Sequence, residues 1–167
     1  MQGDTRAFGR LVSMHQSAVR GFALRLCHDP ALADDLAQEA FLQAYRKLAS
    51  FQGSGSFASW VLGIAYRCFL QHKRRDKRAG EVLHLLEQRD AELARFYEHI
   101  SPAQLDLERA LHALNPNEAA AISLNMSLGY SHAEVAAIMD MPLGSIKSHI
   151  SRGMAKLREL LNAEDAS

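Results

Sequence analysis

The stretch SHAEVAAIMDMPLGSIKSHISRGMAKLRELL, residues 131–161, decides the fold of the second half of this chain. Ser131 and Glu134 form the signature of a capping box, which predicts the start of a short helix. The turn DMP at residues 140–142 ends that helix, because proline cannot continue a helical ladder. A longer helix is expected over residues 143–161. A capped short helix, a tight turn and a longer helix are together the layout of a helix-turn-helix unit.

The longer helix is apolar on one side and basic on the others. Its apolar positions recur at spacings of four, four and three: Ile146, Ile150, Met154 and Leu157. Between residues 143 and 158 it carries four Lys/Arg residues and no acidic residue. Such a helix fits the major groove of DNA, although a solvated basic face is the plain alternative. The polar faces offer six candidate DNA contacts: Ser145, Lys147, Ser148, His149, Ser151 and Arg152.

The first half of the chain also predicts helices. Ala and Leu dominate, proline is scarce, and no segment alternates with period 2, so we predict an all-α fold. Asp4 is placed to cap a first helix that ends near residue 28. Asp29 followed by Pro30 is a start signal for the second helix. A Gly/Ser loop at residues 51–56 then precedes a third, amphipathic helix that ends in the basic run at 73–78.

A change of composition separates two parts of the chain. The segment over residues 79–100 is acidic after the basic run, and capping boxes at Ser101 and Asn115 open new helices after it. We therefore expect two small helical domains, over residues 1–78 and 101–167, with residues 79–100 as a linker. Because that linker is long, we expect the two domains to move relative to each other.

The second predicted helix has an acidic face. Four acidic residues and no basic residue lie between Asp29 and Glu39. Asp34 and Asp35 are adjacent, so they diverge by about 100° around a helix and converge poorly on one ion. Asp35 and Glu39, four residues apart, do share a face. A protein-docking face or plain solvation fits this pattern better than acid–base catalysis or a metal site.

The end of the third helix is strongly basic. Residues 67–78 contain six Lys/Arg and one Asp, and aromatic residues lie beside them. Positive charge interleaved with aromatic rings suits single-stranded nucleic acid, where a stacked base contributes about 1–3 kcal/mol. The competing interpretation places Phe57 and Trp60 in the core, and for Trp60 we favour the core.

Several other classes of protein are disfavoured by the sequence. Lys plus Arg equals Asp plus Glu, at 19 each, so the total charge does not indicate a partner. No apolar run reaches the ~18 residues of a membrane span, and residues 1–4 do not begin a secretory signal, so we expect a cytoplasmic protein. Cys27 and Cys68 are far apart and are expected to be inert core thiols. There is no GxSxG, P-loop or HExxH motif, so we expect no catalytic residues, no metal and no cofactor.

Four blocks of sequence, in order, resemble the compact extracytoplasmic-function class of bacterial sigma factors, which keeps only sigma regions 2 and 4. The blocks are DDLAQEAF with AYRKL at 34–48, FQG through SF and W at 51–60 with IA at 64–65, LNP at 114–116 with GYSHAEVA at 129–136, and PLGSIKSHISRG at 142–153. The resemblance implies a sigma factor that binds core RNA polymerase and directs promoter-specific initiation. A helix-turn-helix regulator that acts without polymerase is the alternative.

The resemblance also implies partners and site residues. Region 2 is expected to dock on the β′ clamp of core polymerase through Asp34, Asp35, Leu36, Gln38, Glu39 and Phe41. It is expected to melt and read the −10 element of promoter DNA through Phe51, Gly53, Ser54, Phe57, Tyr66, Arg67, Gln71, Lys73, Arg74 and Arg75. Region 4 is expected to read the −35 duplex through Ser145, Lys147, Ser148, His149, Ser151 and Arg152, and to hold the β flap. An anti-sigma factor is the further partner implied.

The chain departs from the pattern of this class at a few positions. Gly63 stands where arginine is common, Arg67 where asparagine is usual, and Gln71 where aspartate is frequent. His149 replaces a common arginine, which removes a permanent positive charge at neutral pH. These departures leave the preference of the chain for particular promoter sequences open.

Overall fold

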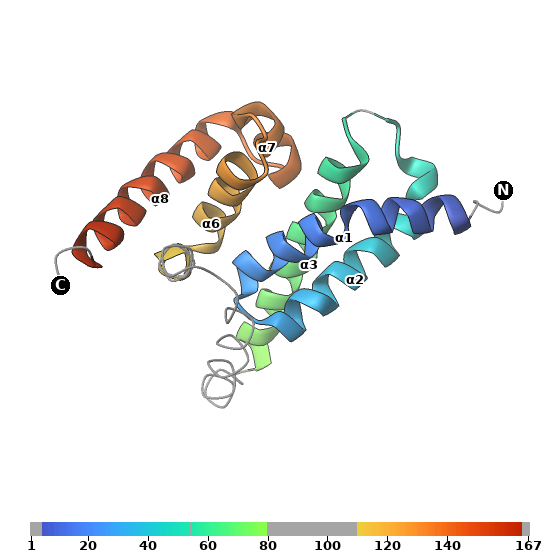
Figure 1. The fold of residues 1–167 in the computed structure, drawn as a ribbon, viewed down its shortest axis with the longest axis horizontal. Helices are drawn as coiled ribbons and strands as arrows, with labels where there is room; N and C mark the ends of the chain where they lie inside the picture. Colours follow the sequence, from blue (N-terminus) through green and yellow to red (C-terminus); the bar gives the residue numbers. More distant parts are fainter. Residues whose placement is uncertain (1–4, 54, 80–109, 165–167) are drawn as a thin grey trace.

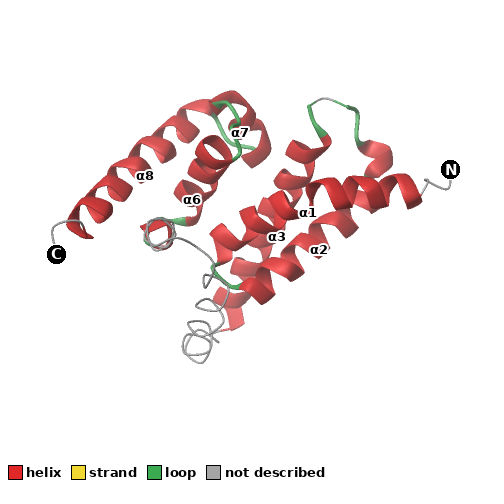
Figure 2. Cartoon of the chain, in the orientation of Figure 1, coloured by secondary structure: helices red, strands yellow, loops and turns green. Residues whose placement is uncertain are grey.

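The residues that the computed structural model describes, which are 5–53, 55–79 and 110–164, form helices joined by loops (Figure 2). The elements in chain order are α1 (Thr5–Cys27), α2 (Pro30–Arg46), the 3-10 turn η1 (Leu48–Ser50), α3 (Phe57–Ala79), α6 (Pro116–Ile122), the π turn η2 (Ser123–Ser127), α7 (His132–Met139) and α8 (Leu143–Glu164). The predicted all-α class is confirmed. The predicted caps at Asp4 and Ser101, and residues 80–100 of the predicted linker, lie outside the described residues.

The first three long helices form a bundle in which α2 packs against both α1 and α3. Helix α2 begins where the sequence predicts, because the Asp29 carboxylate accepts a hydrogen bond of 3.0 Å from the Leu32 backbone N–H and Pro30 occupies the first turn. The inner faces of the bundle bury large side chains, including Phe22, Leu36, Phe41, Val61, Leu62, Ile64 and Phe69. Cys27 and Cys68 are both buried, as predicted, and neither forms a disulfide.

The remaining helices form the predicted helix-turn-helix. Asn115 and Glu118 close a reciprocal capping box at the start of α6, and Ser131 and Glu134 do the same at the start of α7. Helix α7 ends at Met139 and is capped by Asp140, whose backbone is left-handed with φ 52°, and α8 follows after a short turn. Helix α6 and its π turn span the single helix that the sequence predicts, and α8 extends three residues beyond the predicted end.

The two groups of helices pack directly against each other. Helix α6 contacts α1, and α7 contacts α3, so that α6 and α7 lie between the α1–α3 bundle and α8 (Figure 1). The buried apolar side chains of both groups belong to one continuous core. This contact was not predicted from the sequence, which was expected to form two small domains that move relative to each other.

A close approach between α6 and α8 generates a prediction about stability. A Cβ atom at Gly153 would lie 2.5 Å from Ile122 Cδ1, whereas one at Gly144, on the same helix, would meet open space. We expect Gly153→Val to lower the free energy of unfolding by about 1–3 kcal/mol, because the extra methyl groups push α8 off α6. Gly144→Val is the matched control and is expected to change stability by about 0.5 kcal/mol or less. Urea unfolding of both variants measures the difference, and equal effects would contradict the packing.

Candidate functional site

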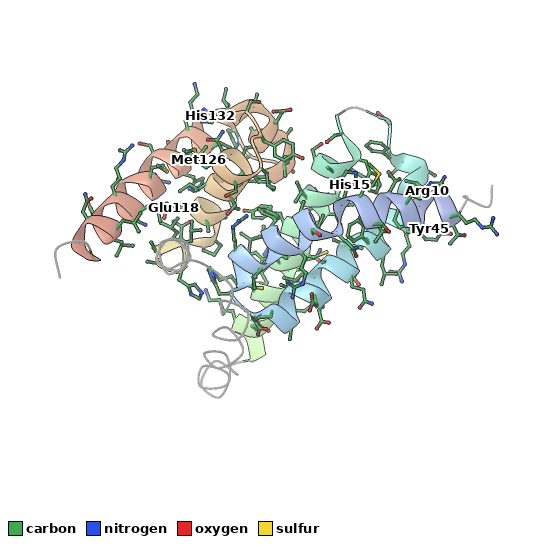
Figure 3. The ribbon with its side chains drawn as sticks, in the orientation of Figure 1. Arg10, His15, Tyr45, Glu118, Met126 and His132 are labelled. Carbon is green, nitrogen blue, oxygen red and sulfur yellow. The ribbon has the colours of Figure 1, made fainter. Side chains whose placement is uncertain are left out.

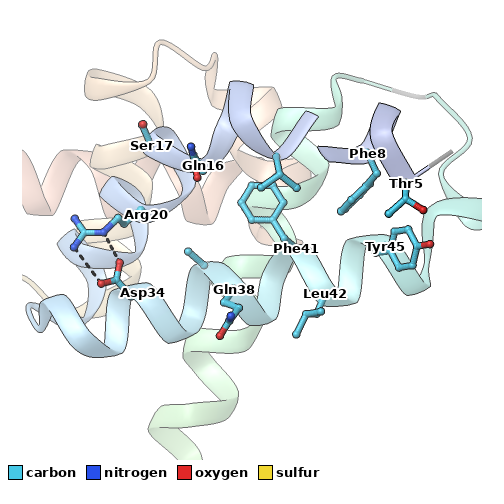
Figure 4. A pocket seen from close by; sticks show the side chains of 12 residues that line it. Thr5, Phe8, Gln16, Ser17, Arg20, Asp34, Gln38, Phe41, Leu42 and Tyr45 are labelled. Carbon is cyan, nitrogen blue, oxygen red and sulfur yellow. Dashed lines mark hydrogen bonds and ion pairs between the residues drawn. The ribbon is translucent and has the colours of Figure 1, made fainter. Parts of the chain in front are cut away.

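An apolar groove runs between α1 and α2 on the side of the bundle away from α3, and we call it the α1–α2 groove (Figure 4). It has a volume of about 580 Å³. Its apolar wall is formed by Phe8, Val12, Phe41, Leu42 and Tyr45. Leu42 and Tyr45 are 46% and 43% exposed, which is unusual for large apolar side chains that neighbour each other. The groove is therefore a surface on which a partner can bury apolar side chains.

Charged residues lie at one end of this groove. Arg20 on α1 forms an ion pair with Asp34 on α2, so the Asp34 carboxylate is already held by the protein. Gln38 and Phe41 also line the groove, although Phe41 is 7% exposed and offers only an edge. Three of the residues predicted to dock on polymerase, Asp34, Gln38 and Phe41, therefore gather here.

The other predicted docking residues face a different hollow. Asp35, Leu36 and Glu39 line a polar cleft between α2 and α3, which we call the α2–α3 cleft. Leu36 is 5% exposed, so it supports the cleft from the core. Asp35 and Glu39 share this face, as their spacing predicts, and they lie in the same cleft as Gln71 and Arg75 of α3. The predicted docking and −10 residues thus meet along this cleft.

Sequence reasoning missed the contribution of α1 to the groove. Phe8 and Val12 are four residues apart, which places them on one face of α1. Tyr45 on α2 is partly exposed and packs edge-on against Phe8 with ring centroids 5.0 Å apart. The spacing of Phe8 and Val12 was the available signal. It indicated an apolar face on the first helix, but not that this face lies beside α2.

The loop before α3 is backed by a cluster of aromatic rings. Phe51 stacks on Trp60 with ring centroids 4.9 Å apart, and Phe57 lies edge-on to Phe51 at 6.1 Å. All three are half-buried, and Phe57 and Trp60 both pack against the core, as the core interpretation predicts. Gly53 has φ 72°, a left-handed turn that favours glycine. Ser54, a predicted −10 residue, lies outside the described residues.

Helix α3 separates its predicted DNA contacts onto two sides. Arg67, Gln71, Lys73, Arg74 and Arg75 are exposed. Tyr66 is 1% exposed, and its hydroxyl donates a 2.7 Å hydrogen bond to Asn117 Oδ1 on α6. Burial raises the pKa of the Tyr66 phenol to about 12. Tyr66 is therefore inaccessible to DNA in this arrangement of helices, and its predicted contact with the −10 strand stays a prediction.

Helix α8 presents the predicted recognition surface. Lys147, Ser148, Ser151 and Arg152 are exposed, whereas Ser145 and His149 are half-buried. The side of α8 that faces the core buries Ile146, Ile150 and Leu157, which confirms the predicted apolar stripe. Because the apolar side of α8 packs against the core, its polar residues face solvent.

A buried carboxylate anchors α8 to α6. Glu118 on α6 is 1% exposed, and its Oε2 accepts a 2.8 Å hydrogen bond from Lys156 Nζ (Figure 3). Arg152 Nε lies 3.6 Å from Glu118 Oε1. Burial by itself raises the pKa of the Glu118 carboxyl, but hydrogen bonds from Lys156 and the Asn115 backbone, with the nearby positive charges, hold that pKa below its ordinary value of 4.5. Glu118 is therefore ionised at neutral pH.

The arginine that shares this carboxylate also affects His149. Arg152 Nη2 lies 3.2 Å from His149 Nδ1. Partial burial lowers the pKa of the His149 imidazole below its ordinary value of 6.5, and repulsion from Arg152 lowers it further. His149 is consequently neutral at pH 7, and it meets a ligand as a hydrogen-bonding group without a charge.

The described residues show neither a metal cluster nor a membrane span. Within residues 5–53, 55–79 and 110–164, no three His, Cys, Asp or Glu side chains are grouped to hold a metal ion. No helix in these ranges combines the length and apolarity needed to cross a bilayer.

The chain is similar to known proteins along both halves. Residues 11–79 match the family described as sigma-70 region 2, and residues 104–157 match sigma-70 region 4. The chain is 31% identical over 176 residues to the RNA polymerase sigma-H factor of Pseudomonas aeruginosa, covering 96% of this chain and 89% of that protein. It is 32% identical over 163 residues to the ECF RNA polymerase sigma-E factor of Escherichia coli K12, covering 90% and 84%.

Two solved structures resemble the whole chain. The sigma factor RpoE in complex with the anti-sigma factor NepR from Bartonella quintana matches with a TM-score of 0.76 and 26% identity, covering 94% of this chain and 98% of that one. CnrH in complex with the cytosolic domain of CnrY matches with a TM-score of 0.69 and 27% identity, covering 96% and 91%. Both similarities extend across the two helical groups.

The ion pair at Glu118 generates a prediction about pH. Because the folded-state pKa of Glu118 lies below its ordinary value, its contribution to stability is present above about pH 4.5 and is lost as the pH falls through the folded-state value. We expect Glu118→Gln to lower the free energy of unfolding at pH 7 by about 1–3 kcal/mol, and the difference from the unmodified protein to shrink toward pH 3. Glu159→Gln, an exposed carboxylate on α8, is the control. Urea unfolding at a series of pH values measures both, and a pH-independent deficit would contradict the assignment.

Proposed function

This chain belongs to the extracytoplasmic-function class of the sigma-70 family, and we propose that it acts by binding core RNA polymerase and reading both the −35 duplex and the −10 strand of promoters. One observation carries the proposal. The same chain presents an exposed basic recognition helix, α8, and a separate apolar docking groove on α1 and α2. A protein that only bound duplex DNA would need the first surface and not the second.

Docking on polymerase is assigned to the α1–α2 groove together with the acidic face of α2. The exposed side chains of Leu42 and Tyr45 supply apolar area in the groove, and Asp35 and Glu39 supply charge in the neighbouring α2–α3 cleft. Apolar anchors surrounded by charge are the usual anatomy of a specific protein interface. The β′ clamp of core polymerase is the partner that the resemblance implies for this surface.

DNA binding is assigned to α8 and α3. On α8, exposed Lys147 and Arg152 are suited to phosphates, and Ser148 and Ser151 to phosphates or base edges. On α3, the exposed basic stripe and the aromatic edges of Phe51 and Phe57 suit an unpaired strand, because stacking on aromatic rings tolerates many sequences. The protein supplies no catalytic group in this proposal, and the chemistry of RNA synthesis belongs to the polymerase in the cytoplasm.

An anti-sigma factor is proposed as a further partner. The two similar solved structures are both complexes, one named with the anti-sigma factor NepR and one with the cytosolic domain of CnrY. If a dedicated inhibitor exists, the protein in a cell lysate binds core polymerase less well than the purified protein does. Equal binding in the two preparations would contradict this part of the proposal.

Run-off transcription tests the docking assignment. We expect purified protein to make core polymerase transcribe members of a promoter library, and the double variant Asp35→Arg/Glu39→Arg to lose that activity. Leu42→Arg is expected to reduce it by about tenfold or more, because it places a charge in the apolar groove. Met14→Arg, which changes a side chain that is 73% exposed and lies outside the groove, is the matched control. Duplex binding without any transcript would favour the alternative of a regulator that acts without polymerase.

Salt dependence tests the assignment of α8. We expect Lys147→Ala to weaken binding to duplexes of every sequence and to reduce the slope of log K against log salt concentration by about 1, because one phosphate contact is lost. Arg158→Ala removes an exposed positive charge from α8 outside the assigned surface, and it is expected to leave that slope unchanged. Titrations of labelled duplex at several salt concentrations measure both variants, and equal slopes in all three proteins would contradict the phosphate contact.

A further inference from the structure

His149 lies in the middle of the polar surface of α8, and a neighbouring side chain holds its ring. Residues three and four positions apart share one side of a helix, so His149 lies between Ser145 and Arg152. Arg152 Nη2 is 3.2 Å from His149 Nδ1, which is a hydrogen-bonding distance. The sequence predicts His149 as a −35 contact, but it does not indicate how the ring is held.

The chemistry of this contact determines which ring nitrogen carries the proton. A guanidinium donates hydrogen bonds and cannot accept one, so Nδ1 of His149 is the acceptor. Partial burial and the charge of Arg152 both lower the pKa of the imidazole, so the ring is neutral at pH 7. A neutral imidazole carries one proton, and with Nδ1 accepting, that proton lies on Nε2. The ring therefore has one N–H donor, located at Nε2.

Arg152 is itself anchored from the core. Its Nε lies 3.6 Å from Oε1 of the buried Glu118 carboxylate. Lys156 Nζ binds the other oxygen of that carboxylate, Oε2, at 2.8 Å. The guanidinium thus lies between a fixed carboxylate on α6 and the imidazole on α8. The orientation of the His149 ring therefore depends on both helices.

The Nε2 atom of His149 is the ring nitrogen that can meet a ligand. Among the residues that the structure describes, no group forms a hydrogen bond with this atom, and it is not buried. An N–H donor matches acceptors on base edges: guanine presents N7 and O6 in the major groove, whereas cytosine presents a donor. Exposed Lys147 and Arg152 carry the charges that suit phosphates, which leaves the uncharged ring between them for a base edge.

We propose that Arg152 holds His149 in the tautomer that donates from Nε2, and that this donor makes His149 a specificity-determining residue for guanine in the −35 duplex. This role rests on the proposed function, because it names the base chemistry that α8 reads. The arginine that is common at this position in the class would donate through a charged fork of several N–H groups. His149 instead forms one hydrogen bond and does not attract phosphates by charge.

Long-range ¹H–¹⁵N NMR spectra of the full chain test the tautomer, because they distinguish a protonated ring nitrogen from an unprotonated one. Spectra are recorded at slightly alkaline pH, where the ring is neutral, and His149→Gln identifies the signals by their absence. We expect the proton on Nε2 in the unmodified protein and a mixture of both tautomers in Arg152→Ala. Arg158→Ala removes an exposed positive charge elsewhere on α8, and this matched control is expected to keep the single tautomer.

A proton on Nδ1 in the unmodified protein would overturn the role of Arg152. The same single tautomer in Arg152→Ala would overturn it as well, because the arginine would then not select it. Arg152→Ala leaves Lys156 bound to Glu118, and circular dichroism checks that each variant is folded. If Arg152→Ala does not fold, the promoter series described next decides the inference by itself.

Transcription with core polymerase tests which base His149 reads. A promoter from the library is changed one base pair at a time across the −35 element, and transcript yields are compared at protein concentrations below saturation. We expect one position where exchanging G·C for C·G, which puts a donor in place of acceptors, lowers the yield by about two- to tenfold, the effect of one hydrogen bond. In His149→Leu the preference at that position is expected to disappear and the others to remain. Arg158→Ala is expected to keep every preference.

The outcomes separate the role of His149 from the proposed function. If His149→Leu leaves every preference intact, lowers all yields by the same factor, or loses a preference for cytosine, the reading of guanine is overturned while the proposed function stands. If the unmodified protein supports no transcription with core polymerase, the proposed function is overturned, and the reading of guanine with it. The NMR spectra decide the tautomer in either case.

Discussion

The arrangement of the second helical group depends on one buried charge. Among the described residues, Glu118 is the charged side chain that is buried, and it contacts both the start of α6 and the middle of α8. Its carboxylate completes the capping box with the Asn115 backbone, and it binds Lys156 and Arg152 on α8. A buried carboxylate without these partners would be strongly unfavourable, so the start of α6 and the middle of α8 must be formed together. This coupling fixes the helix that carries the predicted recognition surface.

The sequence was sufficient for features that depend on local chemistry. The caps at Asp29, Asn115 and Ser131 satisfy the first N–H groups of α2, α6 and α7 with neighbouring side chains, so their signature lies within a few residues of sequence. The apolar stripe of α8 could be predicted equally well, since it depends only on helical periodicity. Helix boundaries and the helix-turn-helix could therefore be predicted to within a few residues.

Features that depend on contacts between distant segments could not be predicted in the same way. The hydrogen bond between Tyr66 and Asn117 joins residues 51 positions apart, and nothing near Tyr66 in the sequence distinguishes a base-stacking ring from a buried one. The α1–α2 groove likewise needs Phe8 and Tyr45 to meet across two helices. The partnership of Glu118 with Lys156 was also hidden, because a glutamate in a capping box is normally explained by the cap alone.

Helix α3 has one side that faces solvent and another side that the second helical group covers. Tyr66 and Arg67 are adjacent, so their side chains point about 100° apart around the helix axis. The arginine faces solvent with the rest of the basic stripe, whereas the tyrosine faces the second helical group. Arg67 is therefore accessible to a ligand in this arrangement of the helices, whereas the ring of Tyr66 is covered. The packing of the second helical group against α3 thus determines which side of this helix a ligand can reach, while the basic stripe stays accessible.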